Sequence, residues 1–129
     1  MAKILVVDDE VNILTILKDS LEFSGFQVVT APDGQEALDM VAKENPELVV
    51  LDIGMPKMDG WEVCRRLKSD PKTKGLPIII LTAYTQSSDQ KRGAQLGADC
   101  FVAKPCDFTY LVEQINTLLA NKKANSPKG

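Results

Sequence analysis

The sequence contains no histidine. Histidine is the commonest general base in enzymes, the usual zinc ligand, and the base of Ser/His and Cys/His catalytic pairs. Any chemistry must therefore depend on carboxylates, hydroxyls, lysine or a metal ion bound by oxygen atoms.

Long hydrophobic runs, an excess of positive charge and paired cysteines are also missing. No run approaches the roughly 18 apolar residues of a membrane span, so we expect a soluble protein without a membrane segment. The 15 Lys and Arg residues against 18 Asp and Glu give a net charge of −3, which argues against direct binding to nucleic acid. Cys64, Cys100 and Cys106 lack CxxC spacing, and the N-terminus MAKILVVDDE lacks the apolar stretch of a secretory signal. We therefore expect reduced thiols in a cytoplasmic protein.

The length of 129 residues suits one domain of the common size of about 100–150 residues. From Asn121 the sequence turns polar and loses its hydrophobic period. We predict one domain over residues 1–121 and a polar tail or linker over residues 122–129.

Five short apolar runs predict five strands. The runs 3–7, 48–51 and 78–81 are unbroken and rich in β-branched residues, which is typical of strands buried on both faces. The runs 27–30 and 100–103 are weaker and suit the edges of a sheet.

Helical patterns separate these runs. The periodicity predicts helices over 11–24, 34–44 and 59–68, and a last helix that begins after Asp107 as N-cap. Residues 86–97 contain few apolar side chains, so a helix there would be lightly packed. The alternation predicts a doubly wound α/β fold, with a parallel sheet covered on both faces and a ligand site beyond the carboxyl ends of the strands.

Charged and hydroxyl side chains follow four of the five predicted strands. Asp8 and Asp9 follow the first, Asp52 the third, Thr82 the fourth and Lys104 the fifth. If the first and third strands are neighbours, about 4.8 Å apart, their carboxylates converge and require a cation. Oxygen ligands alone favour Mg²⁺.

Each of these residues also has an ordinary structural explanation. Asp9 could cap a helix, Asp52 could serve a turn, Thr82 could bond its own backbone, and Lys104 could be a surface charge. Four strand ends that together supply carboxylates, a hydroxyl group and a lysine favour a site for a metal ion and a phosphoryl group.

Four motifs make the chain similar to a known family. They are VVDDE at 6–10, LDIGMPKMDG at 51–60, LTA at 81–83 and GADCFVAKP at 97–105. In order and spacing they resemble the response regulator receiver domain, the phospho-acceptor module of two-component signalling, over about residues 3–120. The resemblance implies a flavodoxin-like, five-stranded parallel sheet in the order 2-1-3-4-5 with five helices.

The resemblance implies a phosphoryl acceptor and a magnesium site. Asp52 would take the phosphoryl group from a partner's phosphohistidine. Asp8, Asp9, Asp52 and the backbone carbonyl of Gly54 would hold Mg²⁺, and of the acidic pair Asp9 rather than Asp8 is expected to be the direct ligand. Gly54 offers no side chain to hold an attacking water, so we also expect it to tune the lifetime of the phosphoryl group.

Five further positions take their roles from the same resemblance. Thr82 would bond a phosphoryl oxygen, Lys104 would pair with the phosphoryl group, and the peptide bond from Lys104 to Pro105 would be cis. Phe101 would turn inward when Thr82 moves, although it could equally be an ordinary core aromatic. Tyr84 is bulky enough to cover the site, which suggests slow self-hydrolysis.

The resemblance also implies partners. Without histidine the chain cannot hold its own phosphohistidine, so a histidine kinase or histidine phosphotransferase must act in trans. The protein would catalyse only its own phosphorylation and dephosphorylation. Its output face would combine the helix over 86–97, the strand over 100–103 and the last helix. It would act on a separate target, or belong to a longer DNA-binding or enzymatic regulator.

One departure from the family pattern and three alternative hypotheses bear on this prediction. Cys100 stands where many DNA-binding regulators carry an acidic residue used in pairing, so we expect a monomer or a weak phosphorylation-dependent dimer. A haloacid-dehalogenase-like phosphatase needs a second Asp where this chain has Gly54. In a flavodoxin, residues 8–10 (Asp-Asp-Glu) would repel the flavin phosphate. A degenerate receiver that only binds partners is disfavoured because all five expected functional positions are occupied.

Overall fold

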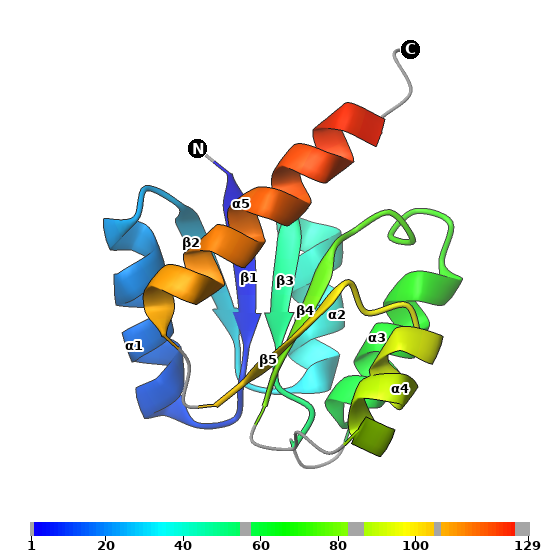
Figure 1. Cartoon of the computed structure of the whole chain (residues 1–129). Helices are drawn as coiled ribbons and strands as arrows, with labels where there is room; N and C mark the ends of the chain where they lie inside the picture. The colour runs from blue at the N-terminus through cyan, green and yellow to red at the C-terminus, as the bar shows by residue number, and fades with distance from the viewer. Residues whose placement is uncertain (1, 55–57, 83–86, 105–106, 126–129) are drawn as a thin grey trace.

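The strands form one parallel sheet. The structure is a computed structural model that describes residues 2–54, 58–82, 87–104 and 107–125. Its sheet has the order β2-β1-β3-β4-β5, which confirms the doubly wound topology (Figure 1). The strands are β1 (Lys3–Val7), β2 (Gln27–Ala31), β3 (Leu48–Leu51), β4 (Ile78–Thr82) and β5 (Cys100–Ala103).

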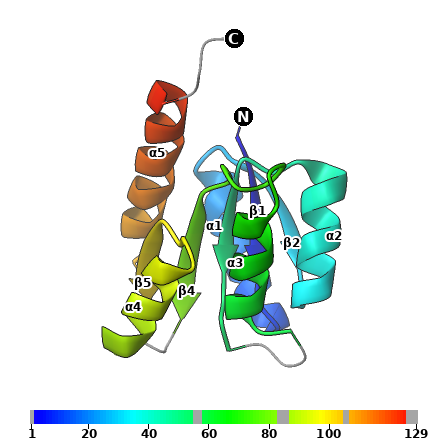
Figure 2. The same cartoon turned by 90° about the vertical axis from the view of Figure 1, so that its right-hand side faces the viewer.

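Helices cover both faces of this sheet. They are α1 (Val11–Phe23), α2 (Gly34–Glu44), α3 (Gly60–Ser69), α4 (Ser87–Gln95) and α5 (Phe108–Asn125). The core below α1 and α5 is separate from the core below α2 and α3, and α4 lies at the β5 end of the second layer (Figure 2).

The side chains of β1 explain why the strand sequences are unbroken apolar runs. Ile4 and Val6 pack toward α1 and α5, whereas Leu5 and Val7 pack toward α2 and α3. All four are at most 1% exposed. A strand with helices on both faces has no solvent-facing side and therefore shows no alternation of polar residues.

Helix starts follow local capping chemistry. The Asp33 side chain accepts a hydrogen bond from the Glu36 amide at 2.9 Å, and Asp59 accepts one from the Glu62 amide at 3.0 Å. Asp107, the predicted cap of the last helix, accepts from the Thr109 amide at 2.8 Å. These bonds satisfy amides that have no partner within the helix.

Several boundaries differ from the sequence prediction. Ala31 and Thr82 each add one residue to their strands. α4 is shorter than predicted, and Gly97, with φ of +93°, lies just beyond its end. α5 continues to Asn125, four residues into the stretch predicted as a tail. Lysine and alanine favour helices, so a helix can outlast its hydrophobic period.

None of the helices within the described ranges is long and apolar enough to cross a membrane.

Candidate functional site

Two aspartates stand where the central strands end. The Asp52 amide donates to the Val7 carbonyl at 3.0 Å, and the Asp8 amide donates to the Ala31 carbonyl at 3.2 Å. The backbone hydrogen bonds of the sheet thus include the amides of Asp8 and Asp52. Their side chains are held at the carboxyl edge of neighbouring strands, as the topology requires.

Three carboxylates converge at this edge. Asp8, Asp9 and Asp52 each place an oxygen within 4.8 Å of the others. Asp8 is 1% exposed and Asp52 is 8% exposed, whereas Asp9 is open to solvent. Like charges at this distance repel one another unless a cation lies between them.

Lys104 supplies part of the balancing charge. Its Nζ lies 2.7 Å from Asp8 Oδ2 and 3.6 Å from Asp52 Oδ2. The lysine follows β5, where its amide donates to the Thr82 carbonyl at 2.9 Å, so the register of β4 and β5 places it. Within the described residues, one ammonium group therefore faces three carboxylates, and the cluster stays negative.

The electrostatics leave Asp52 and Lys104 with shifted pKa values. Burial raises the pKa of Asp52, and the charges of Asp8 and Asp9 add to the increase, against the opposing effects of the Gly54 amide and Lys104. Burial alone would lower the pKa of Lys104, but the hydrogen bond to Asp8 and the nearby carboxylates outweigh it and raise the value. Lys104 therefore stays protonated at neutral pH.

The donor set fits Mg²⁺. The converging atoms are all carboxylate oxygens, two of the three aspartates are buried, and their charge exceeds that of Lys104. Mg²⁺ prefers one or two carboxylates and keeps several waters, which the exposed side of Asp9 allows. Asp9 is not the helix cap considered as an alternative, because the N-cap of α1 is Glu10.

Thr82 and Gly54 also lie at this edge. Thr82 ends β4, the neighbour of β3, and is fully buried. The Gly54 amide donates to Asp52 Oδ1 at 3.2 Å, while the metal-binding role of its carbonyl stays a prediction. Phe101 is half-buried on the side of the sheet that faces α3. Tyr84 and Pro105, and with Pro105 the predicted cis bond, lie outside the described residues.

Sequence reasoning missed the role of Gly60. A Cβ at this position would lie 2.5 Å from the backbone oxygen of Asp52 and 2.6 Å from the Ile53 Cα. Only glycine lets the first turn of α3 come this close to the backbone of Asp52. The available signal was a glycine placed directly after the Asp59 helix cap.

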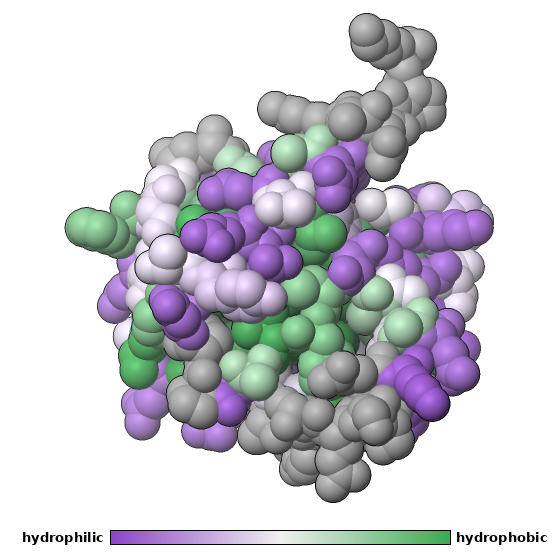
Figure 3. Space-filling view, in the orientation of Figure 1, coloured by the Kyte–Doolittle hydropathy of each residue, from purple (hydrophilic) through white to green (hydrophobic). Residues whose placement is uncertain are grey.

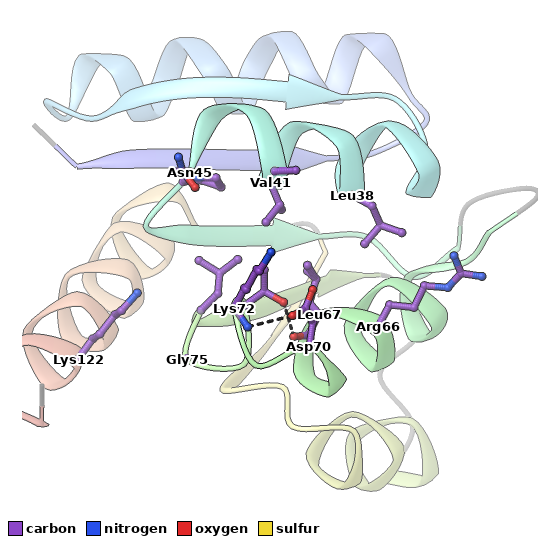
Figure 4. Close-up of a pocket in the computed structure, with 13 residues that line it drawn as sticks. Leu38, Val41, Asn45, Arg66, Leu67, Asp70, Lys72, Gly75 and Lys122 are labelled. Carbon is purple, nitrogen blue, oxygen red and sulfur yellow. Dashed lines mark hydrogen bonds between the residues drawn. The ribbon is translucent and has the colours of Figure 1, made fainter. Parts of the chain in front are cut away.

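A hollow lies away from the aspartates. It is a groove of about 630 Å³ between α2 and α3 (Figure 4). Its walls include Val41 and Leu67, and it reaches Leu76 just before β4, toward the amino ends of the strands. Of its lining residues within the described ranges, Asp70 alone is acidic. The groove is therefore separate from the carboxylate cluster.

Comparison with known proteins agrees with this geometry. The family model of the response regulator receiver domain matches residues 4–116. The chain is 49% identical over 117 residues to a probable transcriptional regulator ycf27 of Cyanophora paradoxa, covering 91% of this chain and 48% of that protein. It is 42% identical over 125 residues to the alkaline phosphatase synthesis transcriptional regulatory protein PhoP of Bacillus subtilis, covering 97% of this chain and 51% of that protein. The chain thus spans about half the length of the curated relatives it matches.

A solved structure shares the whole architecture. The CheY-like response regulator receiver domain protein of Methanospirillum hungatei superposes with a TM-score of 0.92 at 29% identity, covering 98% of this chain and 99% of that one.

Proposed function

Because the chain belongs to the response regulator receiver domain family of two-component signalling, we propose that Asp52 accepts a phosphoryl group from a phosphohistidine on a partner protein. The observation that carries the proposal is the position of Lys104, which bonds Asp8 while its ammonium group also faces Asp52. A fixed cation beside a buried carboxylate is what a phosphoryl acceptor needs, since the incoming group is anionic.

The transfer uses Asp52 as an oxygen nucleophile. A carboxylate oxygen forms a bond to phosphorus while the bond from phosphorus to the imidazole nitrogen breaks. The electron pair of that bond stays on the nitrogen, which takes up a proton from solvent. Asp52 needs no general base because an ionised carboxylate has no proton to lose. This fits a chain without histidine.

Residues of this chain then stabilise the charge of the acyl phosphate. Lys104 pairs with one phosphoryl oxygen, and the Thr82 hydroxyl donates to another. Asp8, Asp9 and Asp52, with the Gly54 carbonyl, would hold Mg²⁺. When bound, the ion supplies positive charge to the equatorial oxygens. Gly54 and Tyr84 would set how long the phosphoryl group survives, and Phe101 would respond to the movement of Thr82.

The output of this reaction is proposed to be a change in the face formed by α4, β5 and α5. Hydrophobic residues gather over β5 between the two helices (Figure 3). Cys100 and Phe101 are half-buried and Ala103 is exposed, so this edge strand offers apolar contact area. Such a patch suits a protein partner.

The partners proposed are a histidine kinase or phosphotransferase as donor and a protein or further domain as target. The names of the ycf27 and PhoP relatives favour control of transcription. With a net charge of −3 this segment has no general attraction for DNA, so a DNA-binding function would belong to another segment or protein. A receiver that passes on phosphoryl groups or acts on a separate target is the second candidate, favoured by the likeness to a structure named as a CheY-like receiver domain protein.

Intact mass after incubation with acetyl phosphate tests the proposal. The parent should gain the mass of one phosphoryl group when Mg²⁺ is present and none in a chelator. Asp52→Asn should gain none, whereas Asp19→Asn, at an exposed aspartate of α1, should behave like the parent. A parent that remains unmodified, or an Asp52→Asn variant modified as fully as the parent, would contradict the assignment.

A further inference from the structure

The described side chains of α4, the helix that precedes β5, make few contacts with the core. In α4 the side chains described are those of residues 91–95, and of these only Gly93 is buried. Ala94 is exposed, so the described part of the helix offers no apolar stripe to the core. Glycine inside a helix also costs about 1 kcal/mol relative to alanine. Within residues 91–95, the docking of α4 therefore depends on a few specific contacts.

Two neighbouring residues of α4 make those contacts with α3 and β5. The Arg92 guanidinium carbon lies 4.9 Å from the centroid of the Trp61 ring, within the range of a cation–π interaction. A Cβ on Gly93 would lie 3.4 Å from Trp61 Cζ3 and 3.5 Å from Phe101 Cδ2. The helix backbone thus fits between two aromatic rings, and Arg92 adds an attraction to one of them.

Trp61 connects this contact to the phosphoryl acceptor. It is 7% exposed and directly follows Gly60 in the first turn of α3. A Cβ on Gly60 would lie only 2.5 Å from the Asp52 backbone oxygen, so this turn has no space to move independently of Asp52. The turn that carries Trp61 therefore packs directly against the backbone of Asp52.

We propose that Arg92 and Trp61 are positioning residues that hold α4 against α3, and that phosphorylation of Asp52 weakens their contact and releases α4. The second half rests on the proposed function, whereas the first half stands on the contact alone. Because α4 has few other contacts in its described part, loss of this one changes the accessibility of the helix without unfolding the core.

Hydrogen exchange of the unphosphorylated protein tests the first half. Arg92→Gln should increase the exchange rate of α4 amides about two- to fivefold, the range expected for a cation–π contact whose cation lies at an exposed position. The matched control is Lys91→Gln, which removes the same charge from an exposed neighbour and should change exchange less than about twofold. Amides of β1 and β3 should exchange as in the parent for both variants. Equal α4 exchange in the two variants would overturn the positioning role.

The same measurement on the phosphorylated protein tests the second half. Intact mass first establishes that the parent and Arg92→Gln are equally modified. The parent should then show faster α4 exchange on phosphorylation, whereas Arg92→Gln should change little, because its contact is already lost. Trp61 is the only tryptophan of the chain, so its emission should shift in the parent alone.

The outcomes separate the two proposals. Full phosphorylation with unchanged α4 exchange in the parent would overturn the coupling and leave the acceptor function standing. Absence of phosphorylation would overturn the acceptor function and the coupling together, while the exchange of unphosphorylated Arg92→Gln would still decide whether the contact positions α4.

Discussion

Replacing Asp52 with asparagine should make the metal-free protein more stable. Asp52 is 8% exposed, and its carboxylate lies within 4.8 Å of the carboxylates of Asp8 and Asp9. Asparagine has nearly the same shape and can still accept the hydrogen bond from the Gly54 amide. The substitution therefore removes a charge with little change in packing.

The expected gain follows from the distances. At an effective dielectric constant between about 20 and 80, repulsion from Asp8 and from Asp9 costs about 1 to 3.5 kcal/mol each. Attraction to Lys104 at 3.6 Å stabilises the Asp52 carboxylate by about 1 to 4.5 kcal/mol over the same range of dielectric constant. The balance is a net repulsion of about 0.5 to 2.5 kcal/mol, which the variant should gain in free energy of unfolding. Burial of the charge acts in the same direction.

The pH dependence has a definite sign. Because burial raises the pKa of Asp52 above its ordinary value of 3.8, the folded protein binds this proton more tightly than the unfolded chain does. The destabilisation is complete above the folded pKa and disappears as the pH falls below the unfolded value. The advantage of Asp52→Asn should therefore shrink as the solution becomes acidic.

Urea denaturation followed by far-ultraviolet circular dichroism measures the effect, at neutral pH and low salt in a chelator. Asp19→Asn is the control and should stay within about 0.5 kcal/mol of the parent. Adding Mg²⁺ should stabilise the parent more than Asp52→Asn, because the variant has lost a carboxylate from the proposed site. If Asp52→Asn is less stable than the parent in the chelator, attraction to Lys104 exceeds the repulsion and the electrostatic argument is wrong.

Three smaller predictions concern α3 and its start. Gly60→Ala should lower the free energy of unfolding by about 1 to 3 kcal/mol, because the added Cβ would overlap the backbone of Asp52 and Ile53. Gly75→Ala is the control, since a Cβ there has no atom within 4 Å, and equal urea midpoints for the two variants would refute the prediction. Burial raises the pKa of the Cys64 thiol to about 11, so at mildly alkaline pH Cys64 should be alkylated in urea but not in the folded protein, as peptide mapping would show. Rapid labelling of Cys64 in the folded protein would contradict this prediction. Hydrogen bonds from Arg65 and Arg66 lower the pKa of Glu62 to about 2. The contribution of ionised Glu62 to folding stability should therefore be complete above pH 4.5 and disappear as the pH falls toward 2. An NMR titration of the Glu62 carboxyl group with a midpoint near 4.5 would refute this prediction.

The fold was predictable because the strands are short and buried on both faces. Ile4 to Val7 admit no polar alternation, and such runs between helical patterns specify a parallel sheet. The strand order, in contrast, came from the resemblance to receivers, since hydrophobic periodicity does not say which strands are neighbours. The end of α5 at Asn125 escaped prediction because helix propensity continued where the hydrophobic period stopped.

The convergence of the carboxylates was predictable for a similar reason. Parallel strands end at one edge, so residues that directly follow them must meet there. The tight contact of Gly60 with the Asp52 backbone was not predictable, because it depends on how α3 approaches the sheet in three dimensions. The partnership of Arg92 and Trp61 depends in the same way on the docking of two helices that are separated in sequence by β4.

Which of two aspartates Lys104 hydrogen-bonds also depends on distances that cannot be read from a sequence. The lysine lies at hydrogen-bonding distance from Asp8, at 2.7 Å, and only faces Asp52, at 3.6 Å. Asp52 Oδ1 accepts a hydrogen bond from the Gly54 amide, and Oδ2 lies 3.6 Å from the ammonium group, beyond hydrogen-bonding distance. An oxygen that attacks phosphorus needs an available lone pair, and a full hydrogen bond to lysine would occupy one and reduce its nucleophilicity. Asp8 thus holds the Lys104 ammonium group beside Asp52, where the proposed function requires positive charge, without a full hydrogen bond from the lysine to the proposed nucleophile.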